Sequence, residues 1–354
     1  MRKFLLLLIS LFLPITVHAN VKVESHLIDS EIEIAGALNV KELIIVEGEG
    51  SFIQRTLNYY SFKDKHWELG DEIDLDNGIF YNAQSISITS VAAYEVDDEV
   101  SFGSFEDKIK NYLKEFDINN PEDTGYTYTD KDDGTVSLKI FYPVKNKRTA
   151  FYINYVVSNA VVKHNDVKEI NYTFKNLNIN SNETYLRVII PYQTDDEEYN
   201  VWVHGNQSGE VHEIANDDGL KAGIIARFPK INESINFRMT LPQKQVGIDL
   251  YLNNSEIDAL DSIKKIEDKK LDKTNKSNRI VKIMKYVLIG IGLVYVVFSF
   301  VFLKLNIKAI YIIYLLLGLF ICLFNYLFKF NYWYLYLVIL FPILIKLLKK
   351  YIVK

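Results

Sequence analysis

The chain has 354 residues, a formal net charge of -5, 49% hydrophobic residues, 14% aromatic residues and one cysteine. The apolar fraction is too high for a disordered chain, and a single cysteine excludes a disulfide scaffold and any zinc module built on several cysteines. The length indicates more than one structural unit. The net charge is an average over unequal parts, because acidic residues dominate positions 20–260 and basic residues dominate the rest.

The first 19 residues have the pattern of a secretory signal peptide. Arg2 and Lys3 form a positive start, residues 4–17 form an apolar stretch, and Ala19 ends a cleavage pattern of small residues. The apolar stretch is shorter than the roughly 20 residues that span a membrane comfortably. We therefore predict that residues 1–19 are removed and that the mature chain is exported; an uncleaved N-terminal anchor is the alternative.

The exported part is predicted to be mainly β structure. Period-two alternation of apolar and polar residues marks strands at 21–27, 31–34, 40–46, 150–162, 184–191, 199–204, 220–228 and 234–241. Asp133-Gly134, between Tyr126–Thr129 and Thr135–Phe141, is typical of a tight β-hairpin. Many short strands separated by turn signals favour a β-sandwich.

A break in the alternation near residues 142–148 predicts two β-sandwich-like domains, 20–147 and 148–254. The first is expected to contain one amphipathic helix that covers an edge or end of its sandwich. Ser104 and Asp107 have the spacing of a capping box, and four apolar residues follow at helical spacing, Phe105, Ile109, Tyr112 and Phe116.

The C-terminal part is predicted to be α-helical and to span the membrane. Residues 255–280 form a basic helical stalk, and residues 281–354 contain three apolar segments, 286–303, 309–328 and 330–348. A re-entrant segment is the alternative for the third, shorter one. Export of the β region places the C-terminus in the cytoplasm, in agreement with the lysines between and after the spans. The segments contain no Asp, Glu, Arg or His, which argues against a transporter.

The stalk carries nine basic residues that this topology places outside the membrane: Lys264, Lys265, Lys269, Lys270, Lys273, Lys276, Arg279, Lys282 and Lys285. Anionic lipid headgroups or envelope polymers would attract them. A solvated, partly ion-paired face is the alternative, since acidic residues are interspersed.

No motif in the sequence carries an established chemistry. Gly205–Gly209 has the wrong spacing for a hydrolase nucleophile and is better explained as a hairpin tip between two paired strands. His204 and His212 would flank that tip and could begin a metal site, but partly buried histidines are the simpler expectation.

Three acidic clusters, 97–99, 130–133 and 195–198, are expected on solvated turns and do not fit a calcium loop. The acidity of the exported part argues against nucleic-acid binding.

Five stretches in order resemble domain-of-unknown-function family 2207, a family of bacterial predicted membrane proteins with an exported β domain. They are Val23–Ile34, Gly50–Thr56 with Arg55, Tyr152–Asn171 with Tyr155, Asp166 and Glu169, Trp202–Gly205 with His204, and Phe237–Pro242. The chain departs from the family pattern at Ile53 and Gln54, where glycine is usual, at Ile170–Thr173, and by the missing glycine-rich cytoplasmic tail. The resemblance implies a location and a fold but no reaction.

We therefore predict a membrane-anchored extracytoplasmic protein, a non-catalytic binding or envelope-assembly module, with no cofactor and no metal. Its partner would be an envelope protein or a cell-wall polymer, and Arg55, Trp202 and His204 are the candidate contact residues, although each also suits a structural role. Two alternatives remain open. The protein could be an exported carboxylate-based hydrolase, or a subunit of a membrane complex that acts through its transmembrane helices.

Overall fold

The computed structural model describes residues 21–59, 84–117, 122–131, 133–177, 181–205, 209–229, 233–245, 253–255 and 257–305. The chain has two compact units, Met1–Lys265 and Ile266–Lys354. The first holds the β strands, and the second holds most of the helix α2 (Leu260–Leu305). The predicted signal peptide and the second and third predicted spans lie outside the described residues.

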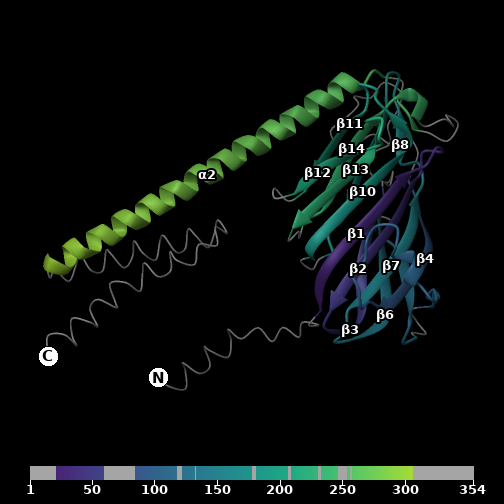
Figure 1. Cartoon of the computed structure of the whole chain (residues 1–354), viewed down its shortest axis with the longest axis horizontal. Coiled ribbons are helices and arrows are strands. Elements are labelled where there is room, and N and C mark those ends of the chain that lie inside the picture. The colour runs from purple at the N-terminus through teal and green to yellow at the C-terminus, as the bar shows by residue number, and fades with distance from the viewer. Residues whose placement is uncertain are drawn as a thin grey trace. The chain divides into compact units, whose positions relative to one another are not determined.

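The largest sheet has seven strands in the order β12-β13-β10-β1-β2-β7-β4 (Figure 1). Neighbouring strands are antiparallel except β1 and β10. Because β7 pairs with β2 and β4, this sheet takes strands from both sides of residue 148. The strand bounds are β1 (Lys22–Ile32), β2 (Leu38–Glu47), β4 (Ile86–Glu95), β7 (Thr149–Val157), β10 (Ser181–Thr194), β12 (Glu210–Ala215) and β13 (Lys221–Pro229).

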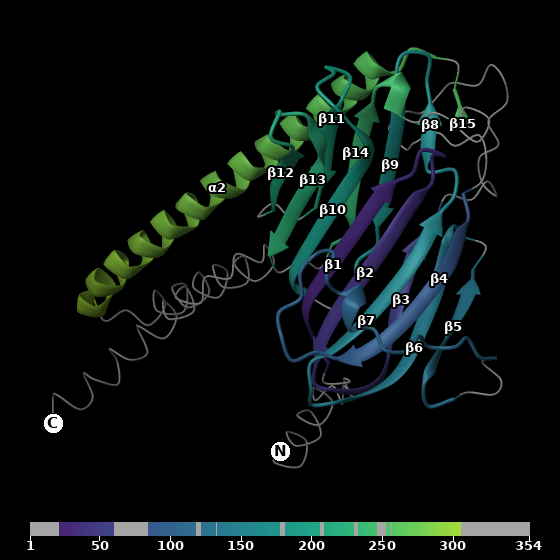
Figure 2. The same ribbon diagram turned by 45° about the vertical axis from the view of Figure 1, so that its right-hand side comes forward.

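Two smaller sheets lie beside different ends of the large one (Figure 2). The three-stranded sheet has the order β3-β6-β5, with β3 (Glu49–Asn58), β5 (Gly125–Asp130) and β6 (Thr135–Lys145). The five-stranded sheet has the order β11-β14-β9-β8-β15, with β8 (Val161–Lys163), β9 (Lys168–Phe174), β11 (Asn200–His204), β14 (Ile235–Leu241) and β15 (Asn253–Asn254). One apolar core includes residues of all three sheets, among them Ile44, Leu138 and Phe237. The prediction of a mainly β region is confirmed.

The predicted Asp133-Gly134 hairpin is confirmed, whereas the predicted hairpin around Gly205–Gly209 is wrong. The first joins the antiparallel strands β5 and β6, and Gly134 has the positive φ of 80° that the turn requires. The strands on either side of Gly205–Gly209 separate instead: β11 pairs with β14 in the five-stranded sheet, and β12 pairs with β13 in the seven-stranded sheet. His204 and His212 therefore lie in different sheets.

The predicted amphipathic helix is reduced to a single 3-10 turn at Glu106–Lys108. The chain is extended from Ile109, and its backbone groups pair with strands: Leu113 N–H donates to Val91 O at 2.8 Å and Phe116 N–H to Tyr126 O at 3.0 Å. These bonds replace those that a helix would make within itself. Phe105 is buried against Tyr152 on the outer side of the seven-stranded sheet, so this segment covers a sheet face.

The helix α2 starts within the predicted stalk and continues into the first predicted span. Ala259 and Ile263, at its start, are fully buried. Within the described part of the chain, no helix combines the length and the apolar character that crossing a membrane requires.

Candidate functional site

A buried ion pair joins the three-stranded sheet to the seven-stranded sheet. Arg55 Nε of β3 lies 2.7 Å from Glu42 Oε2 of β2, and Arg55 Nη2 lies 3.0 Å from Glu42 Oε1, which is a bidentate geometry. Both side chains are at most 1% exposed. Arg55 Nη1 also donates to the backbone oxygens of Thr56 and Lys175, at 2.9 and 2.7 Å. Each of the three guanidinium nitrogens therefore donates at least one hydrogen bond inside the β region.

His26 and Tyr155 complete what we call the Glu42 cluster (His26, Glu42, Arg55 and Tyr155). The Tyr155 hydroxyl donates to Glu42 Oε1 at 2.7 Å, and His26 Nε2 lies 2.8 Å from Glu42 Oε2. A carboxylate only accepts hydrogen bonds, so the contact assigns the imidazole hydrogen to Nε2. Each oxygen of Glu42 thus accepts two hydrogen bonds, which satisfies a carboxylate that is far from water.

Burial and pairing together fix the charges of the Glu42 cluster. Burial favours the neutral form of Glu42, but the Arg55 charge and the bond from His26 outweigh it and hold the pKa of Glu42 well below its usual range. Burial lowers the pKa of His26 in spite of its bond to Glu42, and burial raises the pKa of Tyr155 well above its ordinary value. At neutral pH the cluster holds one negative and one positive charge, and these cancel.

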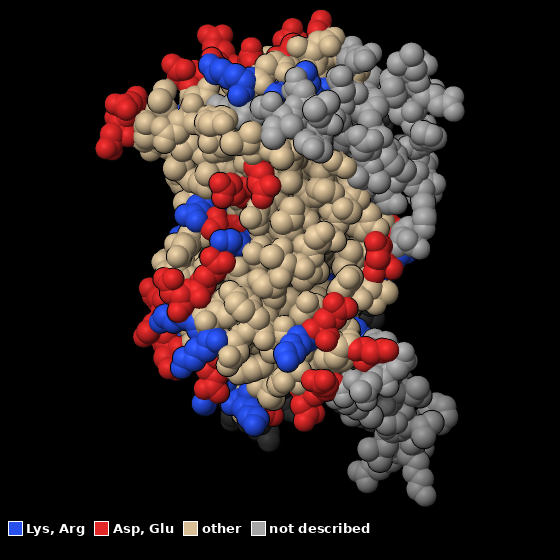
Figure 3. All heavy atoms as spheres, turned by 90° about the vertical axis from the view of Figure 1, so that its right-hand side faces the viewer, with Lys and Arg blue, Asp and Glu red and all other residues tan. Residues whose placement is uncertain are grey.

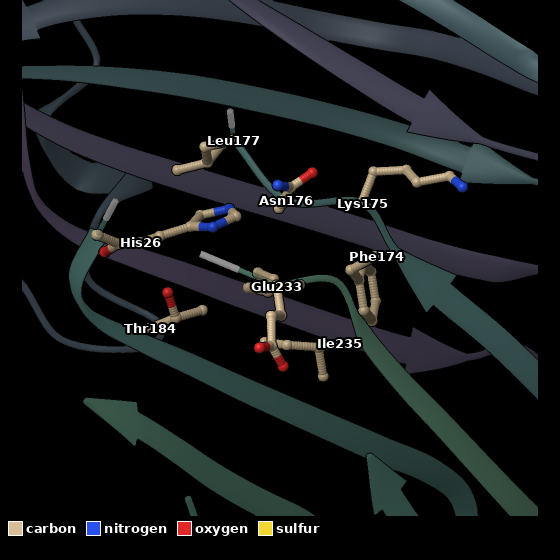
Figure 4. Close-up of a pocket in the computed structure, with 10 residues that line it drawn as sticks. His26, Phe174, Lys175, Asn176, Leu177, Thr184, Glu233 and Ile235 are labelled. Carbon is tan, nitrogen blue, oxygen red and sulfur yellow. The ribbon is translucent and has the colours of Figure 1, made fainter. Parts of the chain in front are cut away.

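A small pocket lies beside His26 (Figure 4). Its volume is about 20 Å³, which is enough for a single water molecule. Thr184 lines it, and the buried Thr184 Oγ1 makes no hydrogen bond within the described residues. A water molecule in this pocket could hydrogen-bond to Thr184 Oγ1. The pocket is too small for a substrate.

A second buried group, the Glu169 cluster (His164, Glu169, Arg238 and Ser255), lies in the five-stranded sheet and its loops. Arg238 Nε donates to Glu169 Oε1 at 2.7 Å, and His164 Nε2 lies 2.8 Å from Glu169 Oε2. The other imidazole nitrogen, Nδ1, is hydrogen-bonded to Ser255 Oγ. All four side chains are at most 3% exposed.

Ser255, His164 and Glu169 are the residue types of a nucleophile, a base and an orienting acid. A hydrolase must present its serine where a substrate carbonyl can reach it. Ser255 is 2% exposed, and its hydroxyl is bonded to the fully buried His164. In this arrangement the three residues cross-link the interior.

The segment that leads from β8 to β9 also holds the start of α2. Asp166 Oδ1 accepts a hydrogen bond from Ala259 N–H at 2.8 Å, and Oδ2 accepts one from Leu260 N–H at 2.9 Å. A carboxylate at this place satisfies free N–H groups of the helix N-terminus and interacts favourably with the helix dipole. Asn165 N–H donates to Ile257 O at 2.8 Å. We call these contacts the α2 clamp (Asn165, Asp166, Ile257, Ala259 and Leu260).

Residues from separate stretches of the sequence meet in these clusters. Arg55 and Tyr155 meet at Glu42, and Glu169 meets Arg238. The sequence interpretation missed Glu42. Its signal is a carboxylate that directly precedes the apolar run Leu43–Val46 in a predicted strand, because a carboxylate at a buried position needs a paired cation.

Trp202 and His204 lie side by side on the face of the five-stranded sheet that also carries the buried Arg238 and Glu169. In β11 they alternate with Val201 and Val203, which pack against the apolar core, so they point the other way. Trp202 is opposite Arg238 on β14 and is half-buried, as is His204. His212 is in another sheet, and no group of three His, Cys, Asp or Glu suited to a metal occurs among the described residues.

The described members of the three acidic clusters lie outside the strands, except Asp130, which ends β5. Acidic and basic side chains are interspersed on the face shown in Figure 3. Asp98 pairs with Lys108 at 3.0 Å and Asp196 pairs with Lys244 at 2.7 Å. Asp132 lies outside the described residues. The exposed members are Asp97, Asp98, Glu99, Asp130, Asp133, Asp195 and Glu197, and Asp196 and Glu198 are half-buried. These carboxylates form surface ion pairs and turns, which differ from the facing pair of a glycosidase.

The N-terminal domain of a family described as "Predicted membrane protein (DUF2207)" matches residues 36–241. No curated protein matches the chain. Among solved structures, the chain is 9% identical to a protein described as a putative protease from Parabacteroides distasonis, with a TM-score of 0.34 over 64% of this chain and 41% of that one. Yeast LTA4 hydrolase in complex with bestatin is 9% identical, with a TM-score of 0.35 over 62% of this chain and 28% of that one.

A protein described as a putative nutrient binding protein from Legionella pneumophila is 11% identical, with a TM-score of 0.27 over 62% of this chain and 67% of that one. The chain thus spans less than half the length of the first two structures. At these scores and identities, the three similarities carry no argument about the function of this chain.

Proposed function

The chain belongs to the DUF2207 family of predicted membrane proteins, and we propose that its β region is a non-catalytic, extracytoplasmic binding or envelope-assembly module anchored by the C-terminal segments. The proposal combines a signal peptide at residues 1–19 with membrane spans at 286–303, 309–328 and 330–348. The β region would stand outside the membrane, and the C-terminus would lie in the cytoplasm.

The observation that carries the proposal is the α2 clamp. Asp166 accepts two hydrogen bonds and Asn165 N–H donates one, and these bonds fix the place where the chain leaves the β region and enters α2. A flexible linker between the β region and the membrane segments would need no such contacts, because it would only limit how far apart the two can be. A helix start that is fastened to the β region supports an anchor that begins directly at the edge of this module.

The topology can be tested with single cysteines, since the only native cysteine, Cys322, can be replaced by alanine. In that background we expect T129C, on an exposed position of β5, to react with a membrane-impermeant maleimide on intact cells. K354C, at the C-terminus, should react only after the membrane is permeabilised. Reaction of K354C on intact cells, or protection of T129C, would contradict the proposed orientation.

Trp202 and His204 are the proposed contact with an envelope protein or a cell-wall polymer. Both point away from the core on one sheet face, and tryptophan is common in binding surfaces because it combines a large apolar area with a hydrogen-bond donor. Arg55 is buried, so we assign it a structural role in the interior of the β region.

Affinity purification of the cross-linked intact protein from membranes tests this contact. We expect W202A/H204A to lose a partner that the unchanged protein retains. Y128A is the matched control, because Tyr128 is an exposed aromatic residue on the three-stranded sheet. Replacement of residues 281–354 by an unrelated anchor should keep the partner. Loss of the partner in that chimera, with W202A/H204A unaffected, would favour a role carried by the membrane segments.

The basic residues of the stalk are proposed to contact anionic headgroups. On α2 the described side chains of Lys269, Lys273, Lys276 and Lys282 are exposed. A fluorescent label on S277C, in protein reconstituted into nanodiscs, should change its emission between zwitterionic and anionic lipid at low salt and lose that difference at high salt. An identical emission in both lipids would favour a solvated stalk.

A further inference from the structure

The seven-stranded sheet ends at β12, whose outer edge pairs with no strand among the described residues (Figure 1). The other end strand, β4, is partly covered, because Leu113 N–H donates to Val91 O. All residues of β12 are exposed or half-buried. A free edge offers unpaired N–H and C=O groups and is the usual place where a sheet gains a strand from another chain.

Val211 and Ile214 are the large apolar residues of β12, and they point to opposite sides of the sheet. Val211 is directly opposite Ala226 of β13, and residues opposite each other in a sheet point to the same side. That side of β13 is the core side, since Ala226 and the neighbouring Ile224 are fully buried. Val211 is nevertheless 45% exposed, because no further strand covers it. The core is therefore open at β12.

We propose that β12 pairs with β12 of a second copy of this chain, antiparallel, about a two-fold axis that passes between the two Val211 residues. A two-fold axis perpendicular to the sheet keeps each face of the sheet on its own side, so Val211 lies opposite Val211 of the second copy. The same register puts Glu210 opposite His212 of the second copy, and His212 opposite Glu210. On the core side the two valines meet, with Glu213 of each copy beside them, and on the outer face Glu210 meets His212.

The charged residues of β12 favour a second copy of this chain as the partner. Charged residues on an edge strand usually prevent pairing, because like charges would face each other. In this register no carboxylate faces a carboxylate: Glu210 faces a histidine, and Glu213, which is already paired with Lys221 at 3.4 Å, faces Gly209. The sequence around Val211 is thus complementary to itself.

The paired stretch is short, so the dimer is expected to be weak. It adds a few main-chain hydrogen bonds and the burial of two valine side chains, far less than the surface that a stable dimer usually buries. Disulfide trapping suits such an interface, because opposite residues in adjacent strands have Cα atoms at a distance that a disulfide can span.

The test uses the full chain in native membranes, with Cys322 replaced by alanine. We expect V211C to form a disulfide-linked dimer of this chain under mild oxidation. E213C is the matched control on the same strand, and it should cross-link at least about tenfold less, because its two copies would be offset by four residues in the proposed register. Equal cross-linking of both variants would indicate random collision and overturn the proposal. Absence of cross-linking in V211C, with the free thiol still reactive to maleimide, would also overturn it.

A charge exchange tests the register without cysteine chemistry. H212E places Glu opposite Glu210 of the second copy, so the dimer fraction after amine cross-linking should fall several-fold. The double variant E210H/H212E restores His opposite Glu and should restore the dimer. A double variant that dimerises no better than H212E would overturn this register. A V211C disulfide to another protein, with no homodimer, would assign the edge to a different partner and overturn the proposal.

Discussion

Arg55 and Glu42 form a bidentate ion pair in the interior between two sheets, where neither side chain is more than 1% exposed. Apolar contacts in a sandwich core specify little about how one sheet slides on another, because they have no direction. The ion pair has a fixed geometry, and each partner would be costly to bury alone. The pair therefore defines one relative position of β2 and β3, which supports the idea that these residues fix the arrangement of the β region.

Removal of one partner should be far more harmful than the same change at the surface. We expect R55M to reduce the free energy of unfolding by about 3–5 kcal/mol, because Glu42 would remain buried without its cation. R227M is the matched control: Arg227 pairs with Glu183 on β10, and its side chain is 50% exposed, so its loss should cost about 1 kcal/mol or less. Urea denaturation of the detergent-solubilised protein, followed by circular dichroism, measures both. Equal losses would show that the buried pair has no special role.

His26 should make the protein less stable in mild acid. Burial lowers the pKa of His26 in the folded state, whereas an unfolded histidine has a pKa of about 6.5. Below that pH the unfolded chain binds a proton that the folded chain does not, so stability falls as the pH decreases, by at most about 1.4 kcal/mol per pH unit. Glu42, with its lowered pKa, contributes stability that is present above about 4.3 and is lost in stronger acid.

The two effects can be separated by comparing urea midpoints between pH 7 and 5. H26Q keeps a hydrogen-bond donor near Glu42 but does not titrate, so the urea midpoint of this variant should decrease less between pH 7 and 5. H212Q, at an exposed position of β12, should leave the decrease in place. A pH dependence that is the same in H26Q and the unchanged protein would show that His26 is not its source.

Many strand positions could be predicted from the sequence because alternation is local, but β3, β4 and β9 escaped prediction. The single strand predicted at 150–162 is wrong, because the chain turns at Asn159, with a positive φ of 52°, and forms β7 and β8. Most of the pairing between strands could not be predicted. The hairpin at Asp133-Gly134 depends on adjacent residues, and its prediction is confirmed. The divergence of β11 and β12 depends on β13 and β14, which follow in the chain, so no local signal announces it. The expected helix around Ile109 failed for the same reason, since Val91 and Tyr126 supply the hydrogen bonds that keep it extended. The ion pair between Arg55 and Glu42 could not be predicted either, because it depends on how two sheets pack against each other.

Gly223 should tolerate no side chain. Its φ is 148°, and a Cβ atom built there would lie 2.1 Å from the Val188 backbone oxygen of β10. The contact is with backbone, so G223A must displace a strand, and we expect a loss of about 3 kcal/mol or more in unfolding free energy. Gly219 is the control, because its φ of 80° is also positive but its Cβ would meet open space. G219A should cost only the backbone strain, about 1–2 kcal/mol. A milder effect in G223A than in G219A would contradict the close approach.

Asp166 should control the start of α2. We expect D166A to lower local stability by about 1–2 kcal/mol, because two helix N–H groups lose their acceptor, and D166N to retain part of it through one carbonyl oxygen. Hydrogen exchange followed by mass spectrometry should show faster exchange in the peptide that contains Ala259 and Leu260, with strands β1 and β2 unchanged. D258N, at an exposed position next to Ala259, is the control for charge alone. Equal exchange in D166A and D258N would mean that the clamp does not hold the start of α2, and the observation that supports the proposed function would be lost.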